Sequence, residues 1–129
     1  MRATTRHADG VTIVSLEGEL DKLTTDAARV ELERAVGGNA VLVDLSSVEF
    51  LDSAGLHMLF RLARATSRTG GRLAMVIPTE SPLRRLVEIT NVDEIAAVCD
   101  SVEEGIARIG GISAAGGTGS GRDELDEQR

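Results

Sequence analysis

The chain has 129 residues and a formal net charge of −7, and its hydrophobic residues, 42% of the total, include no Trp or Tyr and only two Phe. This length suits one domain with one aliphatic core, and an acidic chain with few aromatic side chains is poorly equipped to bind nucleic acid. Because no apolar run approaches the roughly 18 residues of a membrane span, and MRATTRHADG lacks the apolar region of a signal peptide, we expect a cytoplasmic protein without membrane association.

The N-terminal third predicts a hairpin followed by a helix. Residues 2–7 and 11–16 are strand candidates on either side of Asp9-Gly10, a strong turn signal. Gly18-Glu19-Leu20-Asp21 is then expected to break the second strand. A helix begins within residues 23–26, where Thr can cap it, and ends at Gly37-Gly38.

The middle of the chain predicts a strand, a helix and a second strand. Residues 40–45 are continuously apolar and β-branched, which is typical of a central strand buried on both faces. A helix follows over residues 53–69, ends at Gly70-Gly71, and leads into a further buried strand over residues 72–77. This order indicates a βαβ unit with parallel strands.

The C-terminal third completes the domain. We expect a short helix over residues 83–89, a strand near 95–99 and a closing helix over 101–109, in which Ser101 and Glu104 match a capping box. Cys99 permits no internal disulfide, and its apolar neighbours favour a buried structural thiol over a redox site. The folded domain spans residues 1–112, and the acidic, Gly/Ser-rich segment 113–129 is predicted to be a disordered tail. The fold class is α/β, with a mostly parallel mixed sheet of four to five strands and about four helices.

Ser53 is the candidate functional residue. It follows the predicted central strand, in the run Leu51-Asp52-Ser53-Ala54-Gly55, at or near the start of a helix. Loops after the carboxyl ends of parallel strands are where sites form in α/β sheets, since helix N-termini there expose unpaired N–H groups. Taken alone, Asp52 and Ser53 could simply cap the helix.

The wider pattern resembles a known family. The strand and loop VLVDLSSVEFLDSAGL, together with the upstream GELD, resembles the STAS domain, and specifically the anti-sigma factor antagonists of bacterial partner-switching systems. The resemblance covers about residues 11–109. It implies that Ser53 is phosphorylated by an anti-sigma factor with a histidine-kinase-like ATPase fold, and that a metal-dependent serine phosphatase removes the phosphate. It also places on Asp21 an acidic residue that engages the kinase, and Ala54 leaves no second hydroxyl beside Ser53.

The helix over residues 53–69 suggests where a partner binds. Spacing puts Leu56, Leu59, Phe60 and Ala63 on one face, which should pack on the sheet. Met58, Leu62 and Ala65 project from roughly the opposite side, either as a docking surface or beneath the first or last helix of the chain. The expected partner-binding residues are therefore Asp21, Asp52, Ala54, Gly55, Met58 and Leu62. The basic stripe His57, Arg61, Arg64 and Arg68 lies between the two faces.

An enzyme is the weaker interpretation. The Ser53 segment lacks the first glycine of a G-x-S-x-G nucleophile elbow, and nothing orients His57, one turn later, as its base. The sequence has no Walker loop, no G-x-G-x-x-G and no clustered Cys/His set, so we expect no cofactor and no metal. The remaining alternative lies within the same fold, because STAS domains also serve as accessory subunits of lipid-transport ATPases.

Overall fold

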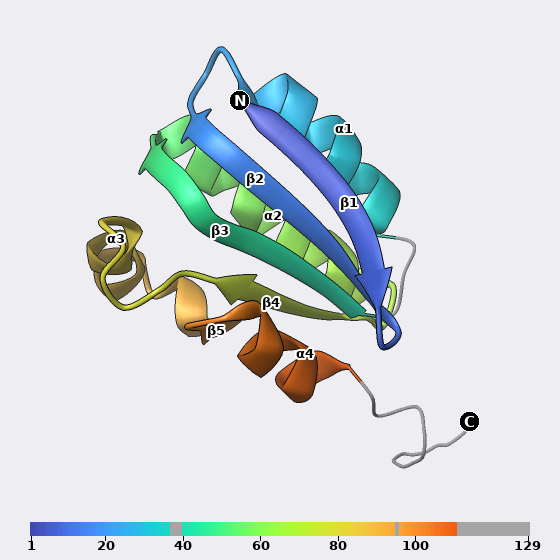
Figure 1. Cartoon of the computed structure of the whole chain (residues 1–129). Helices are drawn as coiled ribbons and strands as arrows, with labels where there is room; N and C mark the ends of the chain where they lie inside the picture. Colours follow the sequence, from blue (N-terminus) through green and yellow to red (C-terminus); the bar gives the residue numbers. More distant parts are fainter. Residues whose placement is uncertain (37–39, 95, 111–129) are drawn as a thin grey trace.

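A computed structural model describes residues 1–36, 40–94 and 96–110 of the chain (Figure 1). Its elements, in chain order, are β1 (Arg2–Ala8), β2 (Val11–Leu20), α1 (Thr25–Ala35), β3 (Ala40–Leu51), α2 (Ser53–Arg68), β4 (Arg72–Val76), α3 (Leu83–Thr90), a 3₁₀ turn (Val92–Glu94), β5 (Ala97–Cys99) and α4 (Val102–Ile109). The predicted tail, residues 113–129, lies outside the described residues.

The five strands form one mixed sheet in the order β1-β2-β3-β4-β5. β1 pairs antiparallel with β2, and all the other neighbouring pairs are parallel. The predicted fold class and the opening hairpin are therefore confirmed. Asp9 and Gly10 both have positive φ, 54° and 79°, which is the backbone that a two-residue hairpin turn requires.

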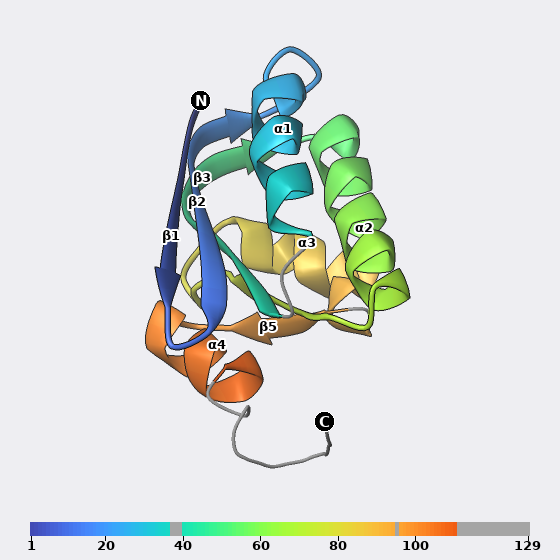
Figure 2. The same cartoon turned by 90° about the vertical axis from the view of Figure 1, so that its right-hand side faces the viewer.

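The sheet separates two apolar layers. On one face, α1 and α2 lie side by side over Val41, Val43 and Leu45 of β3, and α4 covers the other face (Figure 2). Leu42 of β3 points into that second layer, together with Ile109 and Cys99. β3 is thus buried on both faces between residues 40 and 43, as its continuously apolar sequence predicted.

The strands β2 and β3 are longer than predicted. Gly18 does not break β2, which continues to Leu20, and β3 continues to Leu51. Leu20 and Leu51 pair at the ends of these two strands. The register shifts twice along this extension, and Gly18 adopts a φ of 107° there. Glycine therefore marks an irregularity within the strand rather than its end, because it can adopt a positive φ without steric cost.

The predicted capping of the last helix also holds. Ser101 is the residue before α4, and its hydroxyl accepts a hydrogen bond from the Glu104 N–H at 3.1 Å. Cys99, just upstream, is 1% exposed, and burial raises the pKa of its thiol. A raised thiol pKa keeps the sulfur protonated, which agrees with a structural role.

Candidate functional site

Ser53 is the first residue of α2 and lies at the carboxyl end of β3. The residue before it, Asp52, has extended backbone angles and is the N-cap of the helix. The side chain of Ser53 is exposed, and within the described residues its hydroxyl makes no hydrogen bond. Of the two positions predicted for Ser53, the structure selects the first turn, and it assigns the cap to Asp52.

The carboxylate of Asp52 joins two segments of the chain. One oxygen, Oδ1, accepts a hydrogen bond from the Gly55 N–H at 3.0 Å, which is the helix cap. The other, Oδ2, accepts from the N–H of Lys22 at 3.1 Å, in the loop between β2 and α1. The Asp52 N–H in turn donates to the carbonyl oxygen of Leu20 at 3.1 Å. The start of α2 and the β2–α1 loop are therefore held as one unit.

Gly55 allows this close approach. A Cβ atom at this position would lie 2.5 Å from Cδ1 of Leu51 and 2.8 Å from the carbonyl oxygen of Leu20. Both distances are shorter than van der Waals contact, and the second involves backbone that cannot rotate away. Gly55 is buried, so the structure gives it a packing role beneath Ser53 rather than an exposed place in a partner-binding surface.

Asp21 lies in the same loop and organises it. Its Oδ1 atom accepts hydrogen bonds from the backbone N–H groups of Leu23 and Thr24, at 2.9 and 3.0 Å. The Thr24 hydroxyl donates to the carbonyl oxygen of Glu19 at 2.7 Å, which closes the turn. The structure thus brings Asp21, Asp52, Ser53 and Ala54 to one end of the domain, as predicted.

Two apolar side chains at this end were missed by the sequence analysis. Leu23, at the tip of the β2–α1 loop, is 90% exposed, and Phe50, near the end of β3, is 50% exposed. Phe50 pairs in register with Glu19, so both residues lie on the strand ends that lead to the Asp21 loop and to Ser53. The available signal was that neither side chain belongs to an apolar periodicity that would bury it. Exposed large apolar groups beside a candidate site are typical of a docking surface.

Met58 and Leu62 do not belong to that surface. They are 9% and 5% exposed and pack in the core cluster that also contains Ala28 and Leu32 of α1. The expectation that they form an exposed partner-binding strip is therefore wrong, because α1 lies beside α2 and covers them (Figure 2). Coverage by the first helix of the chain was the alternative that the sequence left open, and α1 is that helix. Leu59 and Ala63 are buried, as predicted for the sheet-facing side.

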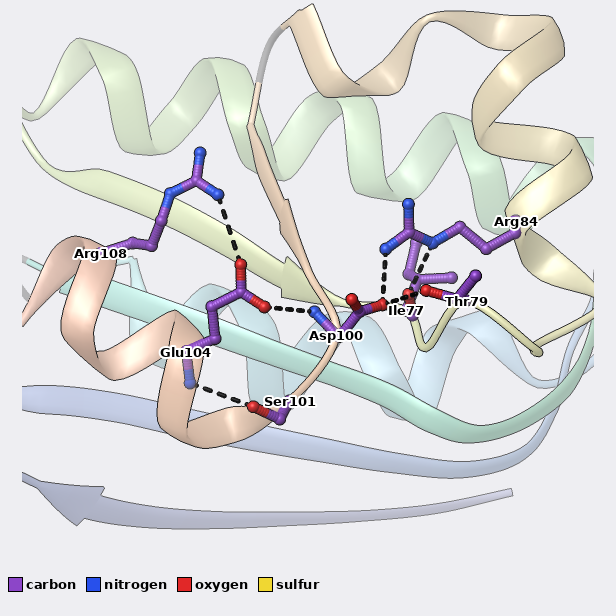
Figure 3. A network of polar contacts seen from close by, with 7 residues as sticks. All are labelled: Ile77, Thr79, Arg84, Asp100, Ser101, Glu104 and Arg108. Carbon is purple, nitrogen blue, oxygen red and sulfur yellow. Dashed lines mark hydrogen bonds and ion pairs between the residues drawn. The ribbon is translucent and has the colours of Figure 1, made fainter.

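A polar network joins the segments that follow the carboxyl ends of β4 and β5 (Figure 3). Asp100 Oδ1 accepts hydrogen bonds from the Thr79 hydroxyl at 2.6 Å and from Nη2 of Arg84 at 2.9 Å. Nε of Arg84 also donates to the carbonyl oxygen of Ile77, and the Asp100 N–H donates to the carboxylate of Glu104. The hydrogen bond from Thr79 is the main reason that the pKa of Asp100 is lowered. These contacts tie α3 and the start of α4 to the end of β4.

The described part of the chain contains neither a candidate metal site nor a candidate membrane-spanning helix. No group of three or more His, Cys, Asp or Glu side chains there could hold a metal ion. Across residues 1–36, 40–94 and 96–110, no helix is long and apolar enough to cross a membrane. His57 is exposed on α2, and no hydrogen bond within these residues joins it to Ser53.

Comparison with known proteins identifies the family. The STAS domain model matches residues 2–105. An anti-sigma F factor antagonist from Paenibacillus polymyxa is 30% identical over 98 residues, which cover 74% of this chain and 83% of that protein. The anti-sigma-F factor antagonist RsfB of Mycobacterium tuberculosis is 30% identical over 107 residues, 80% of this chain and 84% of that protein. The crystal structure of an anti-sigma factor antagonist from Mycobacterium paratuberculosis superposes with a TM-score of 0.76 at 26% identity, covering 84% of this chain and 92% of that one. The chain therefore belongs to the STAS domain family.

Proposed function

We propose that this protein is an anti-sigma factor antagonist whose binding state is set by phosphorylation of Ser53. In the unphosphorylated form it binds an anti-sigma factor with a histidine-kinase-like ATPase fold, and this partner transfers the γ-phosphate of ATP to the Ser53 hydroxyl and then releases the product. A metal-dependent serine phosphatase restores the binding form. The names of the relatives support the general role. The observation that carries the proposal is that Asp52 caps α2, which leaves the exposed Ser53 hydroxyl free for another reaction.

The surface around Ser53 is suited to bind a partner without rearranging. Asp52 fixes the start of α2, and Asp21 fixes the β2–α1 loop that Asp52 holds to it, so little conformational entropy is lost on binding. Leu23 and Phe50 supply exposed apolar area, and Glu19 and Glu49 surround it with negative charge. A partner with an apolar contact patch and a basic rim is complementary to this surface.

Phosphorylation acts on that interface through charge. A phosphoserine adds about −1.5 to −2 charges, and a helix N-terminus accepts an anion without unfolding. One pair of unit charges about 6 Å apart is worth about 0.7 kcal/mol in water and about 3 kcal/mol at an effective dielectric of 20. A loss of binding of about a hundredfold to a thousandfold needs about 3 to 4 kcal/mol, which repulsion and desolvation of the phosphate can supply together.

The test uses variants that separate charge at Ser53 from charge elsewhere on the same helix. Ser53→Asp should abolish binding to the kinase-type anti-sigma factor, and Ser53→Ala should bind but no longer be released by ATP. Ser67→Asp, at the far end of α2, is the matched control and should bind like the original protein. Binding is measured by titration calorimetry with and without ATP. Equal affinity of the Ser53→Asp and Ser53→Ala proteins would refute the switch.

The identity of the partner needs its own experiment. The original protein and the Ser53→Asp variant are used as baits in a lysate of the source cells, and captured proteins are identified by mass spectrometry. The proposal predicts a kinase-type anti-sigma factor on the original protein and its absence from the variant. Capture of a lipid-transport ATPase by both baits would instead assign the protein to the accessory-subunit role.

A further inference from the structure

A groove runs between α1 and α2 on the face of the sheet that these helices cover. It has a volume of about 570 Å³. The buried side chains of Leu32, Met58 and Leu62 lie at its bottom, and the apolar side chains that remain partly exposed along it are Val36, Ala54 and Ala65. Figure 2 shows the two helices side by side, and residues of both line the groove. Ala54 and His57 also line it, so one end of the groove adjoins the first turn of α2, where Ser53 lies.

The charge of the groove is opposite to that of the whole chain. Its lining includes Arg29, Arg61, Arg64 and Arg68, against two carboxylates, Asp26 and Glu33. Arg29 is already paired with Asp26 at 3.0 Å. The three arginines of α2 are exposed, and none has an ion-pair partner in the part of the chain that the structure describes. Arginines beside apolar side chains, on a protein of net charge −7, are complementary to an acidic segment that contains an apolar residue.

We propose that the occupant of this groove is the acidic segment 123–127 of the same chain. Its sequence is Asp123-Glu124-Leu125-Asp126-Glu127, which sets one leucine between two pairs of carboxylates. The carboxylates pair with Arg61, Arg64 and Arg68, and Leu125 covers the partly exposed apolar side chains of the groove. This inference concerns a surface separate from the Ser53 hydroxyl and does not depend on the proposed function.

The described chain ends where this segment can reach the groove. Gly110 lies beside the β1–β2 turn, since a Cβ atom at this position would meet Cγ2 of Val11 and the carbonyl oxygen of Asp9. That turn lies at the end of the sheet where β4 begins, a few residues after α2 ends at Arg68. Residues 111–122 separate Gly110 from the acidic segment, and an extended chain of that length reaches about 40 Å.

Because the acidic segment belongs to the same chain as the groove, even weak binding would give substantial occupancy of the groove. A short linker gives an effective concentration on the order of 1 mM. A segment that bound the groove with a Kd of about 1 mM as a separate peptide would then occupy it about half of the time. Because Arg61, Arg64 and Arg68 follow Ser53 on the same helix, carboxylates paired with them would lie about two to four helical turns from Ser53.

Paramagnetic NMR on the full chain tests this contact. A nitroxide label is attached to Ser120→Cys, and Cys99, at 1% exposure, is protected from the reagent. The proposal predicts loss of amide signals along α2 near Arg61, Arg64 and Arg68 and on the facing side of α1. The loss should disappear in Asp123→Asn/Glu124→Gln/Asp126→Asn/Glu127→Gln and at about 1 M salt, where the Debye length is about 3 Å.

Matched variants of the groove complete the test. Arg61→Gln/Arg64→Gln/Arg68→Gln should abolish the signal loss on α1 and α2, whereas Arg6→Gln/Arg85→Gln, which removes exposed charges outside the groove, should preserve it. The spectra themselves report that each variant is folded. Signal loss confined to the β1–β2 turn and α4, or unchanged in the groove variant, would overturn the inference. So would signal loss that appears only when labelled protein is mixed with isotope-enriched unlabelled protein, since the occupant would then be a second molecule.

Discussion

Replacement of Asp52 by alanine should destabilise the domain far more than replacement of Ser53. The Asp52 carboxylate caps α2 through the Gly55 N–H, and it also accepts a hydrogen bond from the Lys22 N–H, 30 residues earlier in the chain. Ser53 is adjacent, but its hydroxyl makes no hydrogen bond in the described structure. Both residue types are good N-caps in general, so the two substitutions separate the residue that caps from the residue that only follows the cap.

The magnitudes follow from the bonds that each substitution removes. Loss of an N-cap costs about 1 kcal/mol, and loss of the hydrogen bond to Lys22 costs about another 1 kcal/mol, so Asp52→Ala should lower the free energy of unfolding by about 2 kcal/mol. For a domain of this size that corresponds to a fall in Tm of about 6 to 12 °C. Ser53→Ala removes an exposed hydroxyl without a partner and should change stability by less than about 0.5 kcal/mol.

Urea titration followed by circular dichroism measures both values, with thermal melting as a second readout. Asp52→Asn is the matched control: it retains one accepting oxygen, but its amide group presents donors to the second N–H, so its loss should be about half that of alanine. Asp26→Ala, which removes a carboxylate in the first turn of α1 that is paired only with Arg29, should have little effect. A Ser53→Ala protein as destabilised as Asp52→Ala would show that Ser53 caps the helix and would refute this assignment.

Three further predictions follow from the packing and the polar network. Gly55→Ala should cost about 1 to 3 kcal/mol in urea unfolding, because its Cβ would overlap the Leu20 carbonyl oxygen at the end of β2. Met58→Ala and Leu62→Ala should each cost about 2 to 5 kcal/mol, as core residues do; values near zero would mean that α1 does not cover them. Asp100 has a lowered pKa in the folded state, so its contribution to stability is present above its unfolded pKa of about 3.9 and is lost as the pH falls through the folded pKa. Thr79→Val should therefore flatten the decline in unfolding free energy below about pH 4, and an unchanged acid limb would contradict this cause.

The sequence predicts most of the fold because its local signals agree. The apolar strand over residues 40–45, the helix beginning at Ser53 and the strand from Arg72 were placed within a residue or two, except that β3 continues to Leu51. The extension of β2 and β3 was missed because it contains Gly18, which has low strand propensity, and the polar pair Ser46-Ser47, which interrupts the apolar run of β3. Pairing of Leu20 with Leu51 and burial of Val48 outweigh that local preference.

The side chains of α2 show a different limit of sequence analysis. Periodicity correctly separates Leu59 from Met58 and Leu62 on the helix surface, but it does not say which element covers the second side. That depends on the tertiary position of α1, which packs beside α2 and buries both residues. Leu23 and Phe50 show the converse limit. Neither belongs to an apolar periodicity that would bury it, but only the ends of β2 and β3 in the structure show that the two exposed side chains lie near Ser53.

The position of Ser53 explains how one residue can change a surface without changing the fold. The stability of the helix start depends on Asp52, so a reaction at the Ser53 hydroxyl removes no stabilising hydrogen bond. Under the proposed function, a phosphate at Ser53 would nevertheless stand beside the Asp52 carboxylate, which holds the Lys22 N–H and, through it, the loop that carries Asp21 and Leu23. Repulsion between these two anions would act first on that loop, because the hydrogen bond from the Lys22 N–H to the Asp52 carboxylate is exposed. A charge added at Ser53 would thereby change the β2–α1 loop as well as the helix start, while the two buried layers on either side of the sheet stay intact.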